Sequence, residues 1–237
     1  MSDARRPDAA PAVSAVIDGA AALGVRLESA QAQQLLRLAA ELARWNKAYN
    51  LTAITDPRQV LTQHLLDSLA AQDELAGTRI ADVGTGAGFP GLPLAIVNPQ
   101  RQFLLIDAVD KKLRFIDHVA RELALPHVRT LHARVEQLGP GHAADPGPQD
   151  TLLTRAFAPL PRLLELVAPL AGPHTRVVAM KGRWPPAPGA EDHGELPPGW
   201  RLVQARRVVV PGLAAERHLL RLERRGGASH DTRAPVP

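Results

Sequence analysis

The feature that most constrains the fold is a regular alternation of strand-like and helix-like segments between residues 78 and 181. Short β-branched or apolar runs indicate strands, and longer runs with apolar residues three and four apart indicate helices. The strand-like runs are 78–83, 102–107, 127–133, 151–156 and 176–181, and the helix-like runs are 91–97, 110–125 and 160–170. Alternation of this kind predicts an α/β fold, a doubly wound, mostly parallel sheet with crossover helices. Two further strand-like runs, 200–210 and 218–223, predict an antiparallel pair at the C-terminus.

The residues before this alternation predict a helical layer. Apolar residues recur at spacings of three and four from Leu35 to Trp45, as on one face of a helix. We expect Ser29 to cap that helix, and Asp56 followed by Pro57 to begin the next one.

No internal repeat and no second alternating block divides the chain, so we expect one domain over residues 12–225. Within it, residues 12–74 form the N-terminal helical layer and residues 75–225 form the core. The ends, residues 1–11 and 226–237, have the composition of disordered tails.

The charge is unevenly distributed along the 237 residues. Residues 1–150 carry a net charge of −2 and residues 151–237 a net charge of +6. A basic C-terminal part suits a polyanionic partner, although arginine-rich composition alone explains it equally well. The chain has no cysteine, which excludes disulfides and thiol nucleophiles. It has no apolar run of the ~18 residues that a membrane helix needs, and no apolar stretch follows the charges of its first residues. We therefore expect no secretory signal and a cytoplasmic protein without a membrane contact.

A glycine-rich stretch, DVGTGAGFPG at residues 82–91, follows the first predicted strand. Alternating glycines such as Gly84 and Gly86 let the backbone turn sharply and let a ligand approach closely. Asp107 ends the next strand, 19 residues after Gly88, where a carboxylate can accept ribose hydroxyls; its alternative role is to cap the following helix. This pattern predicts a site for a nucleoside-bearing cofactor at the carboxyl end of the first strand.

An acid, Asp82, precedes the glycines by two positions. A carboxylate there suits the ammonium group of S-adenosylmethionine and would repel the pyrophosphate of a dinucleotide. The alternative is that Asp82 accepts hydrogen bonds that stabilise the loop, and both roles are compatible. The pattern is that of class I, Rossmann-like S-adenosylmethionine methyltransferases.

Taken together, the motifs closely resemble those of the bacterial glucose-inhibited division protein B family, also called RsmG. The resemblance runs from about Leu36 to Arg224 and rests on WNKAYNLT (45–52), HLLDSL (64–69), DVGTGAGFPGLPLA (82–95), DAVDKKLRF (107–115), RVEQL (134–138), TRAFAPL (154–160), MKG (180–182) and ERHLL (216–220). It implies transfer of a methyl group from S-adenosylmethionine to N7 of guanosine 527, in the 530 loop of 16S ribosomal RNA. The implied partner is that RNA, the small ribosomal subunit or an assembly intermediate, bound by a protein that we expect to be a monomer.

The resemblance also implies site residues. It places Gly84, Phe89, Val135, Glu136 and Arg155 at the cofactor, with Val135 and Glu136 beside the adenine. Guanine N7 carries a lone pair and no proton, so we expect no general base. Arg155 and Lys181, at the ends of adjacent strands, would act by positioning; a strand-capping or ion-pairing role is the alternative for both.

Other residues have weaker signals. We assign Asn50 and Arg217 to the RNA substrate together with Lys181, although Asn50 would equally serve as a helix C-cap. The later arginines, Arg206, Arg207, Arg217, Arg221, Arg224 and Arg225, indicate either an RNA-binding surface or an exposed strand face. His64 and Asp67 share a helix face, and we interpret them as a structural pair because no nucleophile motif accompanies them. The nine histidines show no metal-ligand spacing, and we predict no metal.

Three alternatives stay open at this stage. The chain could be a methyltransferase for a small molecule or a protein, a nucleotide-binding oxidoreductase, or an RNA-binding protein without enzymatic activity.

Overall fold

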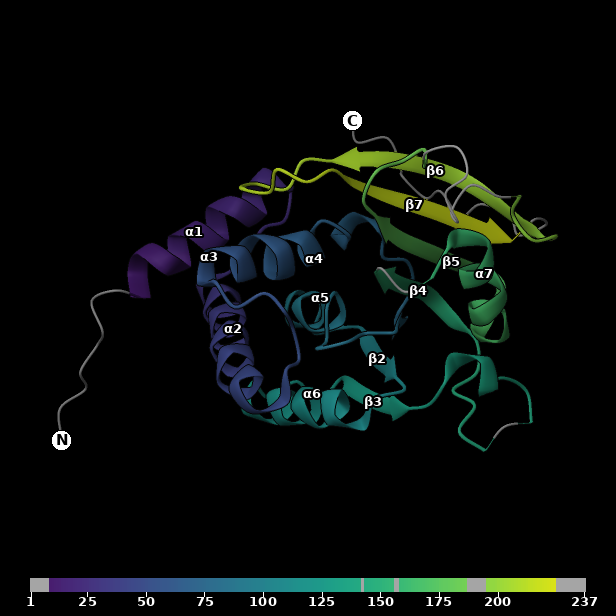
Figure 1. Cartoon of the computed structure of the whole chain (residues 1–237), viewed down its shortest axis with the longest axis horizontal. Coiled ribbons are helices and arrows are strands. Elements are labelled where there is room, and N and C mark those ends of the chain that lie inside the picture. The colour runs from purple at the N-terminus through teal and green to yellow at the C-terminus, as the bar shows by residue number, and fades with distance from the viewer. Residues whose placement is uncertain (1–8, 142, 156–157, 187–194, 225–237) are drawn as a thin grey trace.

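The computed structural model describes residues 9–141, 143–155, 158–186 and 195–224. Within them, the seven strands form a single sheet in the order β3-β2-β1-β4-β5-β7-β6 (Figure 1). The strands are β1 (Arg79–Val83), β2 (Gln102–Asp107), β3 (Val128–His132), β4 (Gln149–Arg155), β5 (Ala171–Lys181), β6 (Trp200–Val208) and β7 (Arg217–Arg224). The first five pair in parallel and β7 pairs antiparallel with both β5 and β6, which confirms the predicted fold class.

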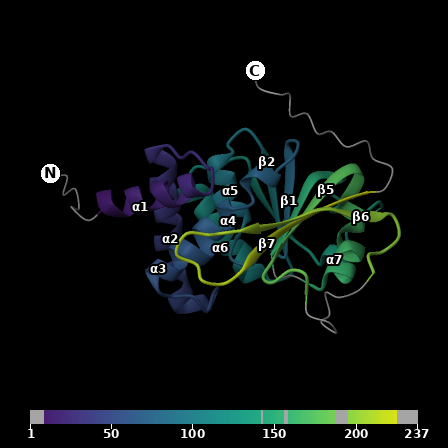
Figure 2. The ribbon, with the colours of Figure 1, turned by 90° about the horizontal axis from the view of Figure 1, so that it is seen from above.

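Helices cover both faces of the sheet. The helices are α1 (Ala9–Ala22), α2 (Ser29–Tyr49), α3 (Pro57–Val60), α4 (Asp67–Leu69), α5 (Gly91–Val97), α6 (Asp110–Glu122) and α7 (Leu160–Val167). The N-terminal helices, α5 and α6 share one apolar core with one face of the sheet, whereas α7 packs in a second core on the other face. Figure 2 shows the N-terminal helices and α7 on opposite sides of the strands.

The N-terminal layer differs from the prediction in detail. Glu28, and not Ser29, is the N-cap of α2: its side chain and that of Gln31 form a reciprocal capping box. Asp56 caps α3 as predicted, accepting a 2.9 Å hydrogen bond from the backbone N–H of Gln59, with Pro57 at the first helical position. A π-helix, Leu61–Leu66, separates α3 from α4 where the sequence predicted a regular helix.

The ends of the domain fall partly outside the described residues. Helix α1 begins at Ala9, inside the expected tail of residues 1–11. The expected tail of residues 226–237 lies outside the described residues. None of the described helices is long and apolar enough to cross a membrane.

Candidate functional site

The glycine loop turns sharply between β1 and α5. Gly84, Gly86 and Gly88 all have positive φ, at +68°, +62° and +86°. The backbone N–H groups of Gly84 and Thr85 donate to the carbonyl of Ile106, which ties the loop to the end of β2. A Cβ added to Gly86 would meet no described atom within 4 Å, whereas one added to Gly88 would lie 2.5 Å from Leu92 Cδ1. Gly86 therefore faces open space, and Gly88 permits close packing of α5.

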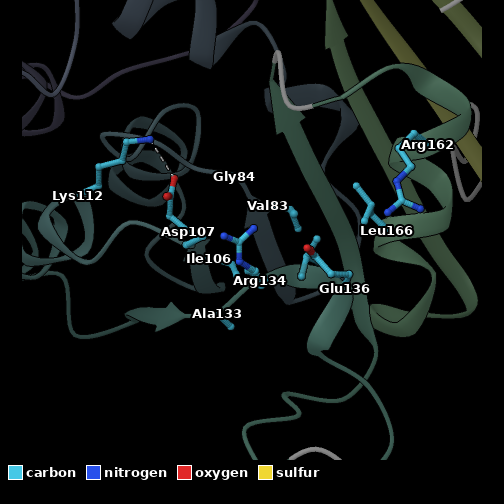
Figure 3. Close-up of a pocket in the computed structure, with 12 residues that line it drawn as sticks. Val83, Gly84, Ile106, Asp107, Lys112, Ala133, Arg134, Glu136, Arg162 and Leu166 are labelled. Atoms are coloured by element: carbon cyan, nitrogen blue, oxygen red, sulfur yellow. Dashed lines mark hydrogen bonds and ion pairs between the residues drawn. The ribbon is translucent and has the colours of Figure 1, made fainter. Parts of the chain in front are cut away.

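A first cavity of about 430 Å³ opens beside this loop, at the carboxyl ends of β1 and β2. Four predicted cofactor residues line it, namely Gly84, Asp107, Val135 and Glu136. The lining also includes Lys112, Arg134, Arg162 and Leu166, which the sequence analysis did not identify. Figure 3 shows Asp107 and Lys112 on one wall and Arg162 and Leu166, from α7, on the opposite wall. Lys112 and Arg134 could have been found as lining residues from their closeness in sequence to Asp107 and Val135. No sequence pattern indicated that Arg162 and Leu166 of α7 would line the cavity.

Asp107 ties the glycine loop to the turn before α6, but Val109, and not Asp107, is the N-cap of α6, and the role of Asp107 toward ribose hydroxyls stays a prediction. Its Oδ2 accepts from the backbone N–H of Gly86 at 2.9 Å, and its Oδ1 accepts from that of Val109 at 2.9 Å, just before α6 begins. Lys112 Nζ lies 3.5 Å from Oδ2 (Figure 3). Since each carboxylate oxygen has two lone pairs, Asp107 retains capacity for hydroxyl donors from the cavity.

Asp82 is completely buried beneath the loop and is not among the residues that line the first cavity. Its Oδ2 accepts from the Thr85 hydroxyl at 2.6 Å and from the Gly91 backbone N–H at 2.8 Å. Its Oδ1 has no hydrogen-bond partner within the described part of the chain. Burial raises the pKa of Asp82 to about 6. These contacts support the loop-stabilising interpretation, and the role toward an ammonium group stays a prediction.

A second cavity, of about 320 Å³, lies at the carboxyl ends of β4 and β5. It brings together three residues that were predicted to position or bind the substrate, Arg155, Lys181 and Arg217. The other lining residues are Ile54, Gln63, His64, Asp67, Met180 and Gly182. Arg155, predicted to contact the cofactor, thus lines this cavity and is not among the lining residues of the first.

The N-terminal layer supplies the acidic and aromatic side chains of this second cavity. Asp67 Oδ2 accepts from Arg155 Nη1 at 3.2 Å, and its Oδ1 accepts from Arg217 Nε at 2.9 Å. His64 stacks on Phe89 of the glycine loop, with ring centroids 4.6 Å apart. Burial, and secondarily the charge of Arg155, lowers the pKa of His64 to about 4, so its imidazole is neutral at pH 7. No hydrogen bond joins the side chains of His64 and Asp67 in the described part of the chain; each contacts Arg155 instead, so they connect the N-terminal layer to the sheet. Both also line the second cavity, which the sequence did not reveal.

Phe89 links the two cavities without lining either. Besides its stack on His64, its ring lies 5.9 Å from the Arg155 guanidinium carbon. Its predicted contact with the cofactor therefore stays a prediction.

Asn50 and most of the late arginines lie elsewhere. Asn50 is the exposed C-cap of α2, with φ of +48°, as its alternative interpretation predicted. Of the late arginines, Arg217 alone lines a described cavity; Arg225 lies outside the described residues. Arg206 pairs with Glu74 at 3.3 Å, and Arg224 lies over the Trp200 ring at 4.7 Å. Among the described residues, no cluster of His, Asp or Glu suits a metal ion.

A glycine loop after β1, an acid at the end of β2 and a sheet in which antiparallel β7 lies between β5 and β6 together indicate a class I, Rossmann-like methyltransferase fold. Solved structures with this fold resemble most of the chain. The O-methyltransferase TomG from Streptomyces achromogenes, solved in complex with SAM, has a TM-score of 0.54 and 18% identity, covering 81% of this chain and 90% of its own. TrmN from Thermus thermophilus has a TM-score of 0.51 and 25% identity, covering 76% of this chain and 52% of its own.

The family model described as GidB, rRNA small subunit methyltransferase G, matches residues 31–220. A ribosomal RNA small subunit methyltransferase G from Shewanella amazonensis is 42% identical over 84% of this chain and 92% of its own length. Another, from Azoarcus sp., is 41% identical over 90% of this chain and 97% of its own. The chain therefore belongs to the GidB family, which confirms the resemblance found in the sequence.

Proposed function

We propose that the protein transfers a methyl group from S-adenosylmethionine to N7 of guanosine 527 in 16S ribosomal RNA, within the small ribosomal subunit or an assembly intermediate. The observation that carries the proposal is the open first cavity, which residues of the matched family region line. Family membership supports the ribosomal RNA substrate, and the chemistry of the site supports the donor.

The first cavity fits an adenosyl group by size and by chemistry. Its volume of about 430 Å³ lies within the range of roughly 300–1,000 Å³ that is usual for small-molecule sites. Asp107 offers carboxylate oxygens for ribose hydroxyls, and the 3₁₀ turn Val135–Gln137 borders the cavity where an adenine is expected. The open space over Gly86 leaves room for the remainder of the donor.

The transfer needs alignment more than proton movement. When bound, S-adenosylmethionine supplies an electrophilic methyl group. The N7 lone pair forms the new N–C bond while the bonding pair of the C–S bond returns to sulfur, so guanine gains the positive charge that sulfur loses. We propose that Arg155 and Lys181 hold the nucleotide for in-line attack; such alignment can contribute roughly 7–11 kcal/mol. Arg217 and Asn50 complete the proposed contacts with RNA.

Gly84→Asp tests this proposal. The variant places a side chain at a residue that lines the first cavity, and we expect it to abolish S-adenosylhomocysteine binding in a calorimetric titration. It should also abolish N7 methylation of isolated small ribosomal subunits, mapped by reverse-transcription stops after borohydride and aniline treatment. Wild-type protein that methylates only small molecules or proteins would contradict the proposal. A Gly84→Asp variant that keeps every cellular effect would indicate an RNA-binding role without catalysis.

A further inference from the structure

The second cavity gathers positive charge from three strands. Arg155 ends β4, Lys181 ends β5 and Arg217 begins β7. The strand register explains their meeting, since Arg155 lies opposite Met180 and Lys181 lies opposite His218, the neighbour of Arg217. Three cationic side chains therefore line one edge of the sheet around a single carboxylate, that of Asp67.

The wall of this cavity is rich in hydrogen-bond donors. The side chain of Asp67 is 2% exposed, and each of its oxygens already accepts from an arginine. His64 adds no positive charge because its imidazole is neutral at pH 7. A ligand that offers acceptors and negative charge complements such a wall better than one that offers donors.

Asp67 also fixes the direction of the two guanidinium groups. Arg155 Nη1 donates to Asp67 and to the carbonyl of Gln63 at 2.9 Å. Arg217 donates from Nε to Asp67 and from Nη1 to the carbonyl of Glu216, which leaves its Nη2 without a partner among the described residues. Hydrogen bonds within the protein thus fix one side of each guanidinium group, and both arginines line the cavity.

We propose that this cavity is a clamp for a backbone phosphate of the RNA substrate, and that Asp67 is the positioning residue that orients Arg155 and Arg217 within it. The inference rests on the proposed function and names the chemical group that the second cavity recognises. A phosphodiester presents acceptors only and matches the planar donor array of arginine. The Watson–Crick edge of guanine also presents N–H donors, but the one carboxylate in the cavity lining, that of Asp67, is only 2% exposed and already accepts from both arginines.

The π-helix explains how the N-terminal layer reaches this position. His64 lies within the π-helix Leu61–Leu66, and Asp67 follows it directly. The wider turn changes the direction of the side chains that follow it, and such turns occur frequently at functional sites. The N-terminal layer thereby forms one wall of the clamp.

Asp67→Asn separates positioning from simple electrostatic attraction. The substitution removes a negative charge, so attraction alone predicts tighter binding of isolated small ribosomal subunits at low salt. Positioning predicts the opposite: loss of a charged hydrogen-bond anchor should weaken binding roughly tenfold. S-adenosylhomocysteine binding, measured on the same preparation, should stay at the wild-type value and shows that the variant is folded.

Arg217 variants test the phosphate directly and do not depend on a change at a buried residue. Arg217→Gln should reduce the slope of log K against log salt by about 1, as expected for one lost phosphate contact. Arg217→Lys keeps the charge but loses the planar fork, and it should weaken binding while lowering the slope less. The matched control is Arg201→Gln, at the opposite end of the β6–β7 hairpin, which should leave both quantities unchanged.

The outcomes separate the clamp from the proposed function. If wild-type protein does not methylate small subunits, the proposed function fails. If it does, and the Arg217 variants bind like wild type at every salt concentration, the clamp is wrong while the function stands. Tighter binding by Asp67→Asn would overturn the positioning role.

Discussion

At the scale of single residues, Asp82 shows how a buried charge is kept inside the fold. Its carboxylate lies completely buried between the glycine loop and α5 and accepts from Thr85 and Gly91. Burial raises its pKa to about 6, because the charged form loses hydration that two hydrogen bonds replace only partly. The folded protein therefore takes up a proton more readily at Asp82 than the unfolded chain does. Ionisation of Asp82 therefore lowers the free energy of unfolding, and this loss develops as the pH rises from about 4 through about 6.

Asp82→Asn should remove this pH dependence. The amide oxygen can still accept from Thr85 and Gly91, while the group no longer ionises. We expect the free energy of unfolding of the variant, relative to wild type, to rise between pH 4 and pH 7 by up to about 3 kcal/mol. Urea unfolding of both proteins across this range measures the difference. A difference that stays constant with pH would show that Asp82 ionises normally in the folded protein.

At the scale of elements, two glycines of the loop between β1 and α5 have different structural roles. Gly88 has no space for a Cβ because Leu92 and Ile116 lie against it, whereas Gly86 faces open space. Positive φ favours glycine at both positions. Gly88 thus permits close packing of α5, and Gly86 keeps open the space beside the first cavity.

Gly88→Ala and Gly86→Ala form a matched pair that separates these tasks. Both introduce strain from positive φ, of roughly 1–2 kcal/mol. Gly88→Ala should cost about 1–3 kcal/mol more because of overpacking against Leu92. Gly86→Ala should instead weaken S-adenosylhomocysteine binding with the smaller loss of stability. Thermal unfolding and calorimetric titration test the two effects, and equal stability losses would contradict this division.

At the scale of the whole molecule, ion pairs connect the N-terminal layer to the C-terminal hairpin. Glu74, in the turn before β1, is buried and pairs with Arg206 of β6 at 3.3 Å. Asp67 makes the corresponding contact with Arg217 of β7 at 2.9 Å. Two ion pairs thus join segments more than a hundred residues apart in sequence, and one of them, Asp67–Arg217, lies at the second cavity.

Arg206→Met should destabilise the protein more than Arg201→Met. Loss of Arg206 leaves the buried carboxylate of Glu74 without its ion-pair partner. Because Arg206 is itself about one-third exposed, we expect a cost of about 1–3 kcal/mol. Arg201 pairs with Glu223 at the surface, where such pairs contribute about 0–1 kcal/mol. Chemical denaturation of the two variants compares them, and equal costs would show that the Glu74 contact adds nothing beyond a surface pair.

Much of the fold and four of the residues that line the first cavity were predictable from the sequence. The strands β1, β2 and β4 lie close to their predicted limits, since apolar periodicity and turn residues act over a few positions. Asp107 was placed at the first cavity because parallel strands bring their carboxyl ends to one edge, and Val135 and Glu136 were placed there by the family resemblance. The N-cap of α2 was missed by one residue because Glu28 and Gln31 form a reciprocal capping box that the Ser29 pattern did not reveal.

The sequence by itself determined the alternating α/β architecture, the glycine loop with its neighbouring acid, and the family to which the chain belongs. Each of these depends on residues that are close together in the chain or that recur in a fixed order. Only the tertiary structure decided that Arg155 joins Asp67, Lys181 and Arg217 in a cavity separate from the first. That arrangement depends on the register of an antiparallel strand against β5 and on a π-helix in the N-terminal layer. Both are set by packing between distant segments, which local periodicity does not encode.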